Sequence, residues 1–335
     1  MKKRTVDSVL KRRAESLAQE DECVDFEELK GFFSYMAERH NIWHRRFILK
    51  KPRPWTKDPI LRDYNFTNVY RELDRNTQWL LTHVVHSPKY ASVMSQVWGT
   101  IVFRYFNKPS LFEYMGGIPS FEEYDHAVFE RKVLEYQSKF GRVFTDAYTI
   151  NPPKYKDDIK KGLTRFYCNH IRVLHRRLPK MMERLEEMKK PEEFMKMMCE
   201  LSCIANFLAY EVYCDLTYTD WFPFTDSDYV NPGPGALLGL RILYPRYKKW
   251  RSRNRAMSMI ASLSTCSDSY FRHFGLSIPY WNGKHLGLRS IEHSLCEYAK
   301  YWKMRERIGK QRKRFSPREG NPNQMEFEAF LSKGQ

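Results

Sequence analysis

Apolar residues recur at three- and four-residue steps through much of the chain, and this is the spacing of one buried helix face. In residues 26–36 these steps are filled by phenylalanine, leucine and methionine, and Asp25 is placed to cap the helix. Ser120 and Glu123 have the spacing of a capping box, which predicts another helix start. Taken together, the pattern predicts helices over 26–36, 66–79, 90–106, 120–140 and 161–188.

Proline interrupts this pattern at positions that separate the helices. Three prolines between Lys51 and Pro59 predict an ordered loop, because no helix continues through prolines so close together. Pro191 suits the first turn of a later helix. We expect that helix to carry the most buried stripe of the chain, formed by Leu201, Ile204, Ala205, Leu208 and Val212. Alternating strand patterns and repeats of fixed period are absent, so the predicted fold class is mostly α, a single helical body.

The composition indicates a folded, basic protein. The 335 residues include 57 Lys and Arg against 40 Asp and Glu, a net charge of +17, and 42% are hydrophobic. Wholesale disorder is thereby excluded, and a polyanionic partner is indicated, nucleic acid before an anionic membrane surface. No apolar run is long enough to span a bilayer, and the basic N-terminus lacks the apolar core of a secretory signal, so we expect no membrane association.

The seven cysteines form no C-x-x-C pair, which argues against both a disulfide framework and a zinc ribbon. A reducing compartment is the plain interpretation, namely the cytoplasm, or the nucleus in a eukaryote.

Two segments concentrate the positive charge. Residues 300–318 hold nine Lys or Arg against one acid, and residues 244–255 hold six basic residues interleaved with aromatics. Cations that neutralise phosphates, beside aromatic faces that stack on bases, are what a nucleic-acid groove requires. A solvated helix face is the alternative for either segment alone, but two such segments in a basic chain favour nucleic acid. The candidate DNA-binding side chains are Lys248, Lys249, Arg251 and Arg253.

The densest polar cluster runs from Asp58 to Arg75. A helix over 66–79 would place one set of polar residues on a common face beside its buried stripe, with Asp74 flanking them: Asn68, Arg71, Glu72 and Arg75. A lattice of salt bridges would explain this face as well as a functional site does. The preceding proline-rich loop favours a site, because rigid loops often deliver functional groups, here Arg53, Trp55, Asp58 and Arg62.

The segment NPGPGALLGL at residues 231–240 predicts a glycine hairpin that leads into a helix. Free backbone N–H groups at Gly233 and Gly235 would form a natural seat for a phosphate, as in the helix-hairpin-helix element of DNA glycosylases. An ordinary turn between helices is the alternative. Asp226 and Asp228 precede the hairpin, and a basic segment follows it.

The segment IEHSLCEYAKY at residues 291–301 carries a third group of polar residues. On a helix, Glu292 shares one face with Cys296, and His293 lies over Glu297. A lone histidine without a second paired ligand is more often structural, so we expect no metal site here. The chain contains no P-loop motif and no G-x-G-x-x-G, G-x-S-x-G or H-E-x-x-H motif.

Three runs together resemble a known family: PRPWTKDPILRDYNFTNVYRELDRNTQW, then GPGALLGL, then IEHSLCEYAKY. They are similar to the α-glutamyl/putrescinyl thymine pyrophosphorylases, also described as amino acid:DNA transferases. These enzymes are related to the helical domain attached to phage 5-hydroxymethyluracil DNA kinases. The likeness spans roughly Phe32 to Lys303, and because the P-loop of the kinase is absent, the stand-alone transferase is the better match.

The resemblance implies a fold similar to helix-hairpin-helix DNA glycosylases and a role in bacteriophage thymine hypermodification. In that pathway a kinase converts 5-hydroxymethyluracil in DNA to a pyrophosphoryl ester. The transferase then displaces pyrophosphate with an amine such as glycine, serine, glutamate or putrescine. The implied partners are double-stranded DNA carrying modified uracil and an amine donor, and we expect a monomer.

Such a substitution requires a base flipped out of the stack, a cation for the leaving pyrophosphate, a carboxylate that takes a proton from the amine, and a cation for an amino-acid carboxylate. From residue chemistry, the catalytic candidates are Asp74, Glu72, Arg71 and Asp58. The candidates for binding substrate and pyrophosphate, with or without Mg²⁺, are Arg53, Arg62, Asn68, Arg75, Trp55, Glu292 and Glu297.

Two other functions stay open. One is a glycosylase-like enzyme that excises a modified base with Asp228 as its acid, and the other is a non-catalytic binder of modified DNA. We expect a basic N-terminal extension over 1–25, a helical catalytic domain over 26–303 and a basic, flexible tail over 304–335.

Overall fold

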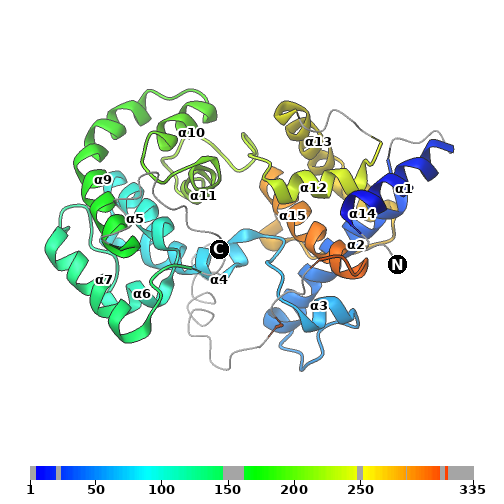
Figure 1. Cartoon of the computed structure of the whole chain (residues 1–335), viewed down its shortest axis with the longest axis horizontal. Coiled ribbons are helices and arrows are strands. Elements are labelled where there is room, and N and C mark those ends of the chain that lie inside the picture. Colours follow the sequence, from blue (N-terminus) through cyan, green and yellow to red (C-terminus); the bar gives the residue numbers. More distant parts are fainter. Residues whose placement is uncertain are drawn as a thin grey trace. The chain divides into compact units, whose positions relative to one another are not determined.

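The computed structural model describes residues 5–19, 24–145, 162–246, 252–283, 285–309 and 314–315. The chain divides into two compact units (Figure 1). Unit 1 combines Met1–Asp74 with Val230–Glu319, and unit 2 is built on Arg75–Tyr229. Where the sequence suggested a single body over 26–303, unit 1 is therefore assembled from two segments that are far apart in the chain.

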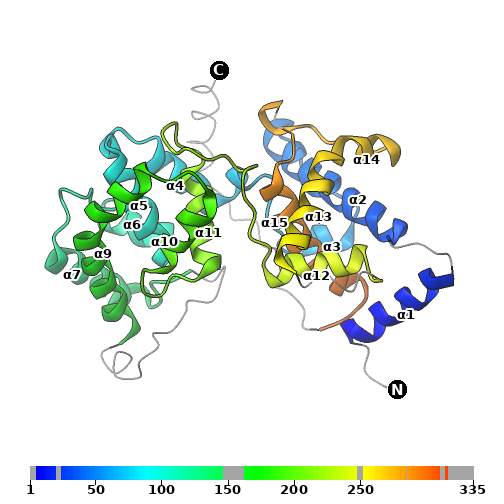
Figure 2. The ribbon, with the colours of Figure 1, turned by 90° about the horizontal axis from the view of Figure 1, so that it is seen from above.

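Unit 1 is organised around its last long helix, α15 (Leu288–Arg305), which contacts α2, α3, α12 and α13. Helix α12 packs closely along α15, and the two lie side by side in both views (Figure 2). The remaining elements of unit 1 are α1 (Val6–Gln19), α2 (Phe26–Trp43), a π-helical turn (His44–Ile48), α3 (Pro59–Asp63), a 3₁₀ turn (Arg71–Leu73), α12 (Pro234–Leu243), α13 (Arg253–Thr265), α14 (Ser267–His273) and a 3₁₀ turn (Trp281–Gly283).

Unit 2 surrounds α5 (Val93–Phe106), whose residues from Val97 onward are all buried. Helices α9 and α11 pack on α5. The charged groups in this core are paired, because Arg104 donates to both carboxylate oxygens of Asp215. The other elements are α4 (Arg75–Leu80), a π-helical turn (Leu81–Val85), a 3₁₀ turn (Pro88–Tyr90), α6 (Pro109–Met115), α7 (His126–Phe140), α9 (Leu163–Glu186), α10 (Pro191–Cys199) and α11 (Asn206–Leu216).

The mostly α-helical prediction is confirmed, since the described residues contain no strand and one isolated bridge, between Tyr64 and Arg314. Helix α2 begins where expected, and the Asp25 side chain accepts the backbone N–H of Glu28. The predictions of α5 and α9 are also confirmed, as is the ordered loop before Pro59. A likeness to helix-hairpin-helix glycosylases stays a prediction.

The predicted helix over 66–79 is wrong. The backbone is extended before a single 3₁₀ turn at Arg71–Leu73, and α4 starts only at Arg75. The reason lies in Asn68, whose backbone and side-chain N–H groups both donate to Asp74, while its side chain also donates to the Leu73 carbonyl. Asn and Asp side chains that bond the nearby backbone in this way compete with helical hydrogen bonds. The common polar face expected from helical spacing therefore does not form.

Two further helices differ from their predicted bounds. Ser120 and Glu123 do exchange the two hydrogen bonds of a capping box, but they close a turn, and α7 starts at His126 under an Asp125 cap. The helix that begins at Pro191 ends at Cys199, and a bend with Cys203 at φ 65° separates it from α11. The expected continuous stripe is divided between these elements, and Ala205 is exposed.

A buried carboxylate joins the two segments of unit 1. Glu28 of α2 is 1% exposed and accepts hydrogen bonds from Tyr298, Trp302 and Arg305 of α15. Arg13 of α1 lies 2.6 Å from the same carboxylate. Buried charges require such pairing. The contact fixes α15 against α2 and also ties part of the expected N-terminal extension into the fold.

Most of the expected basic tail lies outside the described residues. Its described part is not isolated from unit 1, because the backbone N–H of Phe315 donates to the Asp63 carbonyl, and Asn65 donates to the Arg314 carbonyl.

Candidate active site

The three segments singled out in the sequence meet inside unit 1. The backbone N–H of Thr67 donates to Glu297 at 3.3 Å, and that of Gly233 donates to Glu292 at 3.2 Å. The segments therefore converge through packing on α15 and not through a helical polar face.

Asp74 is the centre of this region. Its Oδ1 accepts the backbone N–H of Asn68 at 2.9 Å and the side-chain amide of Asn68 at 3.2 Å. Its Oδ2 lies 3.7 Å from Nε2 of His293 on α15. The side chains of Asp74 and His293 remain 20% and 18% exposed, but Nε2 of His293, the atom that faces Asp74, is buried and has no hydrogen-bond partner.

Burial shifts both members of this pair toward their neutral forms. It raises the pKa of Asp74 to about 6, against the opposing effect of the Asn68 hydrogen bond and of Arg71. It lowers the pKa of His293 to about 4, so the imidazole is neutral at physiological pH. Asp74 is then a carboxylate that is mostly ionised at pH 7 and accepts protons more readily than an ordinary aspartate, which suits a general base.

Positive charge exceeds negative charge around the pair. Arg39 and Arg71 act electrostatically on Asp74, and Arg71, Arg289 and Lys300 act on His293, whereas Glu297 is the carboxylate that acts on both. Two of these guanidinium groups are buried, with Arg71 9% and Arg289 4% exposed. Glu297 is paired with Lys300. Guanidinium groups bind carboxylates and phosphates through paired hydrogen bonds, so this group of cations suits an anionic ligand.

Among the other catalytic and binding candidates, Asp58 has a structural role in this arrangement. Asp58 caps α3 through the N–H groups of Ile60 and Leu61 and accepts the Tyr301 hydroxyl, so its oxygens are already occupied. Glu72 is half-buried in the 3₁₀ turn. Arg75 is exposed and belongs to unit 2.

The cations of the proline-rich loop contact residues other than Asp74 and His293. Arg62 is exposed and forks onto its neighbour Asp63, with N–O distances of 2.7 and 3.2 Å. Arg53 lies over the ring of Trp55, and Phe315 covers the same guanidinium at 5.5 Å. This loop therefore presents stacked cations and aromatics, a surface chemistry that suits nucleic acid.

The glycines of the predicted hairpin serve helix packing. A Cβ at Gly235 would meet Cys296 Sγ at 2.3 Å, and one at Gly239 would meet the Leu295 carbonyl at 2.6 Å. The prediction that the N–H of Gly233 is free for a phosphate is wrong, because this N–H donates to Glu292. Arg253 is exposed and donates to Asn231, while Lys248, Lys249 and Arg251 lie outside the described residues.

Sequence reasoning missed two members of the site. A lone histidine is expected to be structural, yet Nε2 of His293 lies 3.7 Å from Oδ2 of Asp74, a contact that the residue spacing on its own helix does not indicate. Arg39 was not singled out because it lies on the amphipathic helix α2, where charged residues are common. Its guanidinium donates twice to the Phe66 carbonyl, which fixes the extended segment.

Comparison with known proteins assigns the chain that carries this site to a family. The family model of the helical domain of 5-hmdU DNA kinases matches residues 27–311. The chain belongs to the family of that helical domain. The match includes every residue of the Asp74–His293 cluster, from Arg39 to Lys300.

One curated relative of this helical-domain family is the 5-hmdU DNA kinase of Bacillus phage SP10. It is 30% identical over 288 residues, which cover 81% of this chain but 44% of the kinase. The chain thus spans less than half the length of that relative. No solved structure shows a significant match.

Within the described ranges, the helical domain holds no group of three side chains suited to a metal ion, and no helix is long and apolar enough to cross a membrane.

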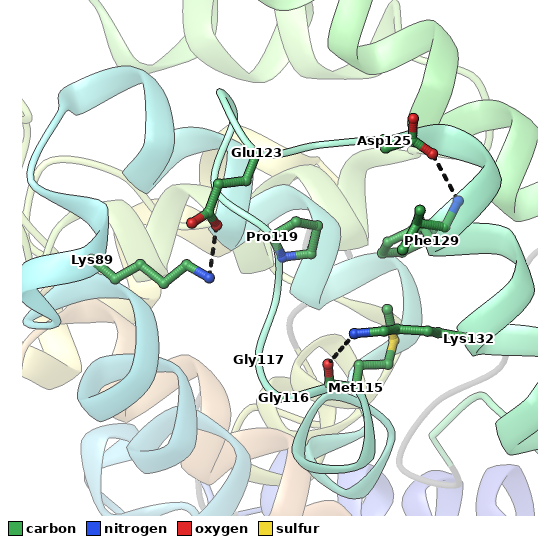
Figure 3. A pocket seen from close by; sticks show the side chains of 10 residues that line it. Lys89, Met115, Gly116, Gly117, Pro119, Glu123, Asp125, Phe129 and Lys132 are labelled. Carbon is green, nitrogen blue, oxygen red and sulfur yellow. Dashed lines mark hydrogen bonds and ion pairs between the residues drawn. The ribbon is translucent and has the colours of Figure 1, made fainter.

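Unit 2 contains a separate pocket of about 270 Å³, formed by the Gly116–Gly117 turn and the start of α7 (Figure 3). Its two lysines are engaged: Lys89 pairs with Glu123 at 2.8 Å, and Lys132 donates to the Met115 carbonyl at 2.9 Å. With its charges satisfied internally, this pocket lacks the cationic excess found around Asp74.

Proposed function

We propose that this chain is a DNA base hypermodification enzyme. It displaces pyrophosphate from 5-(pyrophosphoryloxymethyl)uracil in DNA with an amine, either an amino acid such as glycine, serine or glutamate, or putrescine. Two facts support the proposal: membership in the helical-domain family of 5-hmdU DNA kinases, and a largely buried carboxylate of raised pKa amid buried cations. The raised pKa of this carboxylate, beside buried cations, is the observation on which the proposed chemistry rests.

In the proposed reaction the C–O bond between the C5 methylene and pyrophosphate breaks, and the leaving group keeps the electron pair. A C–N bond forms at the same carbon. The attacking nitrogen loses one proton, which Asp74 accepts through Oδ2, the oxygen not held by Asn68. The imidazole of His293 is neutral at physiological pH and lies on the Oδ2 side of Asp74, where it remains available as a hydrogen-bond partner.

The cations have the complementary task. Charge develops on the bridging oxygen as the C–O bond breaks, and preorganised cations stabilise it without reorganisation. Arg71 is suited to clamp the pyrophosphate because a planar guanidinium binds two oxygens at once. Mg²⁺ bound to the pyrophosphate itself is compatible with this arrangement.

A glycosylase-like activity has less support. Its proposed acid, Asp228, is exposed and accepts hydrogen bonds from the backbone N–H and hydroxyl of Thr225. An acid that protonates a leaving base is expected in a buried setting that raises its pKa.

The direct test is to incubate pyrophosphorylated DNA with a mixture of candidate amines, digest it, and analyse the nucleosides by mass spectrometry. We expect a nucleoside that carries an amine at the C5 methylene. Abasic sites would instead identify a glycosylase, and unchanged nucleosides with retained DNA binding would identify a non-catalytic binder.

A further inference from the structure

Helix α9 of unit 2 has two chemically distinct faces. Its apolar face is buried against α5 and α7 and consists of Phe166, Tyr167, Ile171, Leu174, Leu178 and Met181. Figure 1 shows this helix along the outer side of unit 2, with α5 on its inner side. The opposite face is left to solvent.

The solvent face is strongly basic in its central part. Between Arg172 and Lys180 the sequence has four Lys or Arg and no acid, and all four are exposed: Arg172, Arg176, Arg177 and Lys180. In the part of the chain that the structure describes, none of these four side chains forms a hydrogen bond or an ion pair. Three of them, Arg172, Arg176 and Lys180, follow each other at four-residue steps, about 6 Å apart along the helix axis.

The ends of the same helix are different. Arg165 lies 3.3 Å from Glu130, and Arg184 binds both oxygens of Glu200 at 2.7 and 2.9 Å. The contrast matters because surface cations are usually accompanied by carboxylates. Paired cations therefore flank a central stretch whose cations form no hydrogen bond or ion pair among the described residues, although Arg177 lies near enough to Glu200 to lower its pKa.

The positive charge of this central stretch changes the pKa of a neighbouring histidine. Burial lowers the pKa of His126 at the start of α7, and Arg172 and Arg176 lower it further, against the opposing effects of Glu130 and Asp125. Arg172 and Arg176 therefore act together on the same side of unit 2.

We propose that this α9 face, Arg172, Arg176, Arg177 and Lys180, binds the phosphate backbone of the DNA substrate. The inference rests on the proposed function for the identity of that substrate. Exposed guanidinium groups without carboxylate partners gain most from phosphates, because binding releases counterions and allows bidentate hydrogen bonds. A membrane surface fits less well, since a membrane-bound helix inserts a broad apolar face into the lipid, whereas that of α9 is buried in the core.

The test compares two double variants that lose the same charge from the same helix. Arg172→Gln with Arg176→Gln removes unpaired cations, and Arg165→Gln with Arg184→Gln removes paired ones. Glutamine keeps helix propensity near that of arginine. Binding of fluorescent duplex DNA is measured by anisotropy over a range of salt concentrations, together with melting temperature and transfer activity at saturating DNA.

We expect the first variant to lower the slope of log affinity against log salt by about two units and to weaken binding about tenfold at low salt. The control should change the slope by less than half as much. Both should melt near wild type, and the first should keep its transfer rate at saturating DNA. This last readout separates the two proposals, because absence of transfer in every protein would refute the function and leave the binding comparison intact.

Equal slopes for wild type and the first variant would overturn the inference, as would equal losses in the two variants, which would show an effect of net charge alone. A loss of binding to anionic phospholipid vesicles without a loss of DNA binding would assign the face to a membrane instead.

Discussion

Nε2 of His293 lies 3.7 Å from Oδ2 of Asp74, which joins a loop before α4 to the second turn of α15. The two residues are 219 positions apart in the chain (293 − 74). Both are held in place by packing, and burial favours the neutral form of each. The packing of unit 1 therefore positions the residue that we propose as the base.

Asp74→Asn should abolish transfer while leaving DNA affinity near wild type. Asparagine keeps an oxygen that can accept from Asn68, but it cannot take the proton of the amine. The measurement is the turnover number alongside the dissociation constant for DNA. A well-folded variant with full transfer activity would refute the role of Asp74 as base.

Asp74 makes the stability of the wild-type protein depend on pH, and this dependence sets the expected stability of Asp74→Asn. The pKa of folded Asp74 is raised to about 6 from 3.8, so the neutral form favours folding below about pH 4 and that contribution is lost as the pH rises through 6. At pH 8 the melting temperature of Asp74→Asn should therefore equal or exceed that of wild type. A structural salt bridge at Asp74 predicts a lower melting temperature instead.

The rate of transfer should fall as the pH drops through about 6, because protonated Asp74 cannot accept the proton. A second limb at higher pH, set by the amine itself, should move when a donor of different basicity is used. The lower limb should stay in place. A lower limb that follows the donor would show that it does not belong to the enzyme.

Arg71→Lys should reduce the transfer rate by about a hundredfold, the scale of removing one donor to a developing anion. Lysine keeps the charge but not the bidentate geometry. The matched control is Arg62→Lys, since Arg62 is exposed and bonded to Asp63, and we expect its rate to remain near wild type. Equal losses in both variants would show a general effect of guanidinium groups.

Gly235→Ala should destabilise unit 1 by about 1–3 kcal/mol, because its Cβ would lie 2.3 Å from Cys296 Sγ and force α12 away from α15. Gly233→Ala is the control. Its φ is −78° and the nearest atom would be Glu292 Oε1 at 3.8 Å, so it should be tolerated. Denaturant unfolding measures both, and equal stabilities would contradict close packing at Gly235.

The sequence predicted α2, whose apolar spacing agrees with the Asp25 cap, and the long helix α9, which has no side-chain cap. It failed at 66–79, where apolar spacing favours a helix but Asn68 and Asp74 hold the backbone in another form. The three segments of the site were found because each combines charge with rigid geometry. The pairing of Asp74 with His293 could not be found, because it depends on the position of α15 and leaves no local pattern.

The most direct test of the account quantifies two products in one reaction: pyrophosphate released and amine-bearing nucleoside formed on pyrophosphorylated DNA. The wild-type chain should produce them in equal amounts, and Asp74→Asn should produce neither while still binding the DNA. Release of pyrophosphate without an amine adduct for any donor, or undiminished adduct formation by Asp74→Asn, would contradict it.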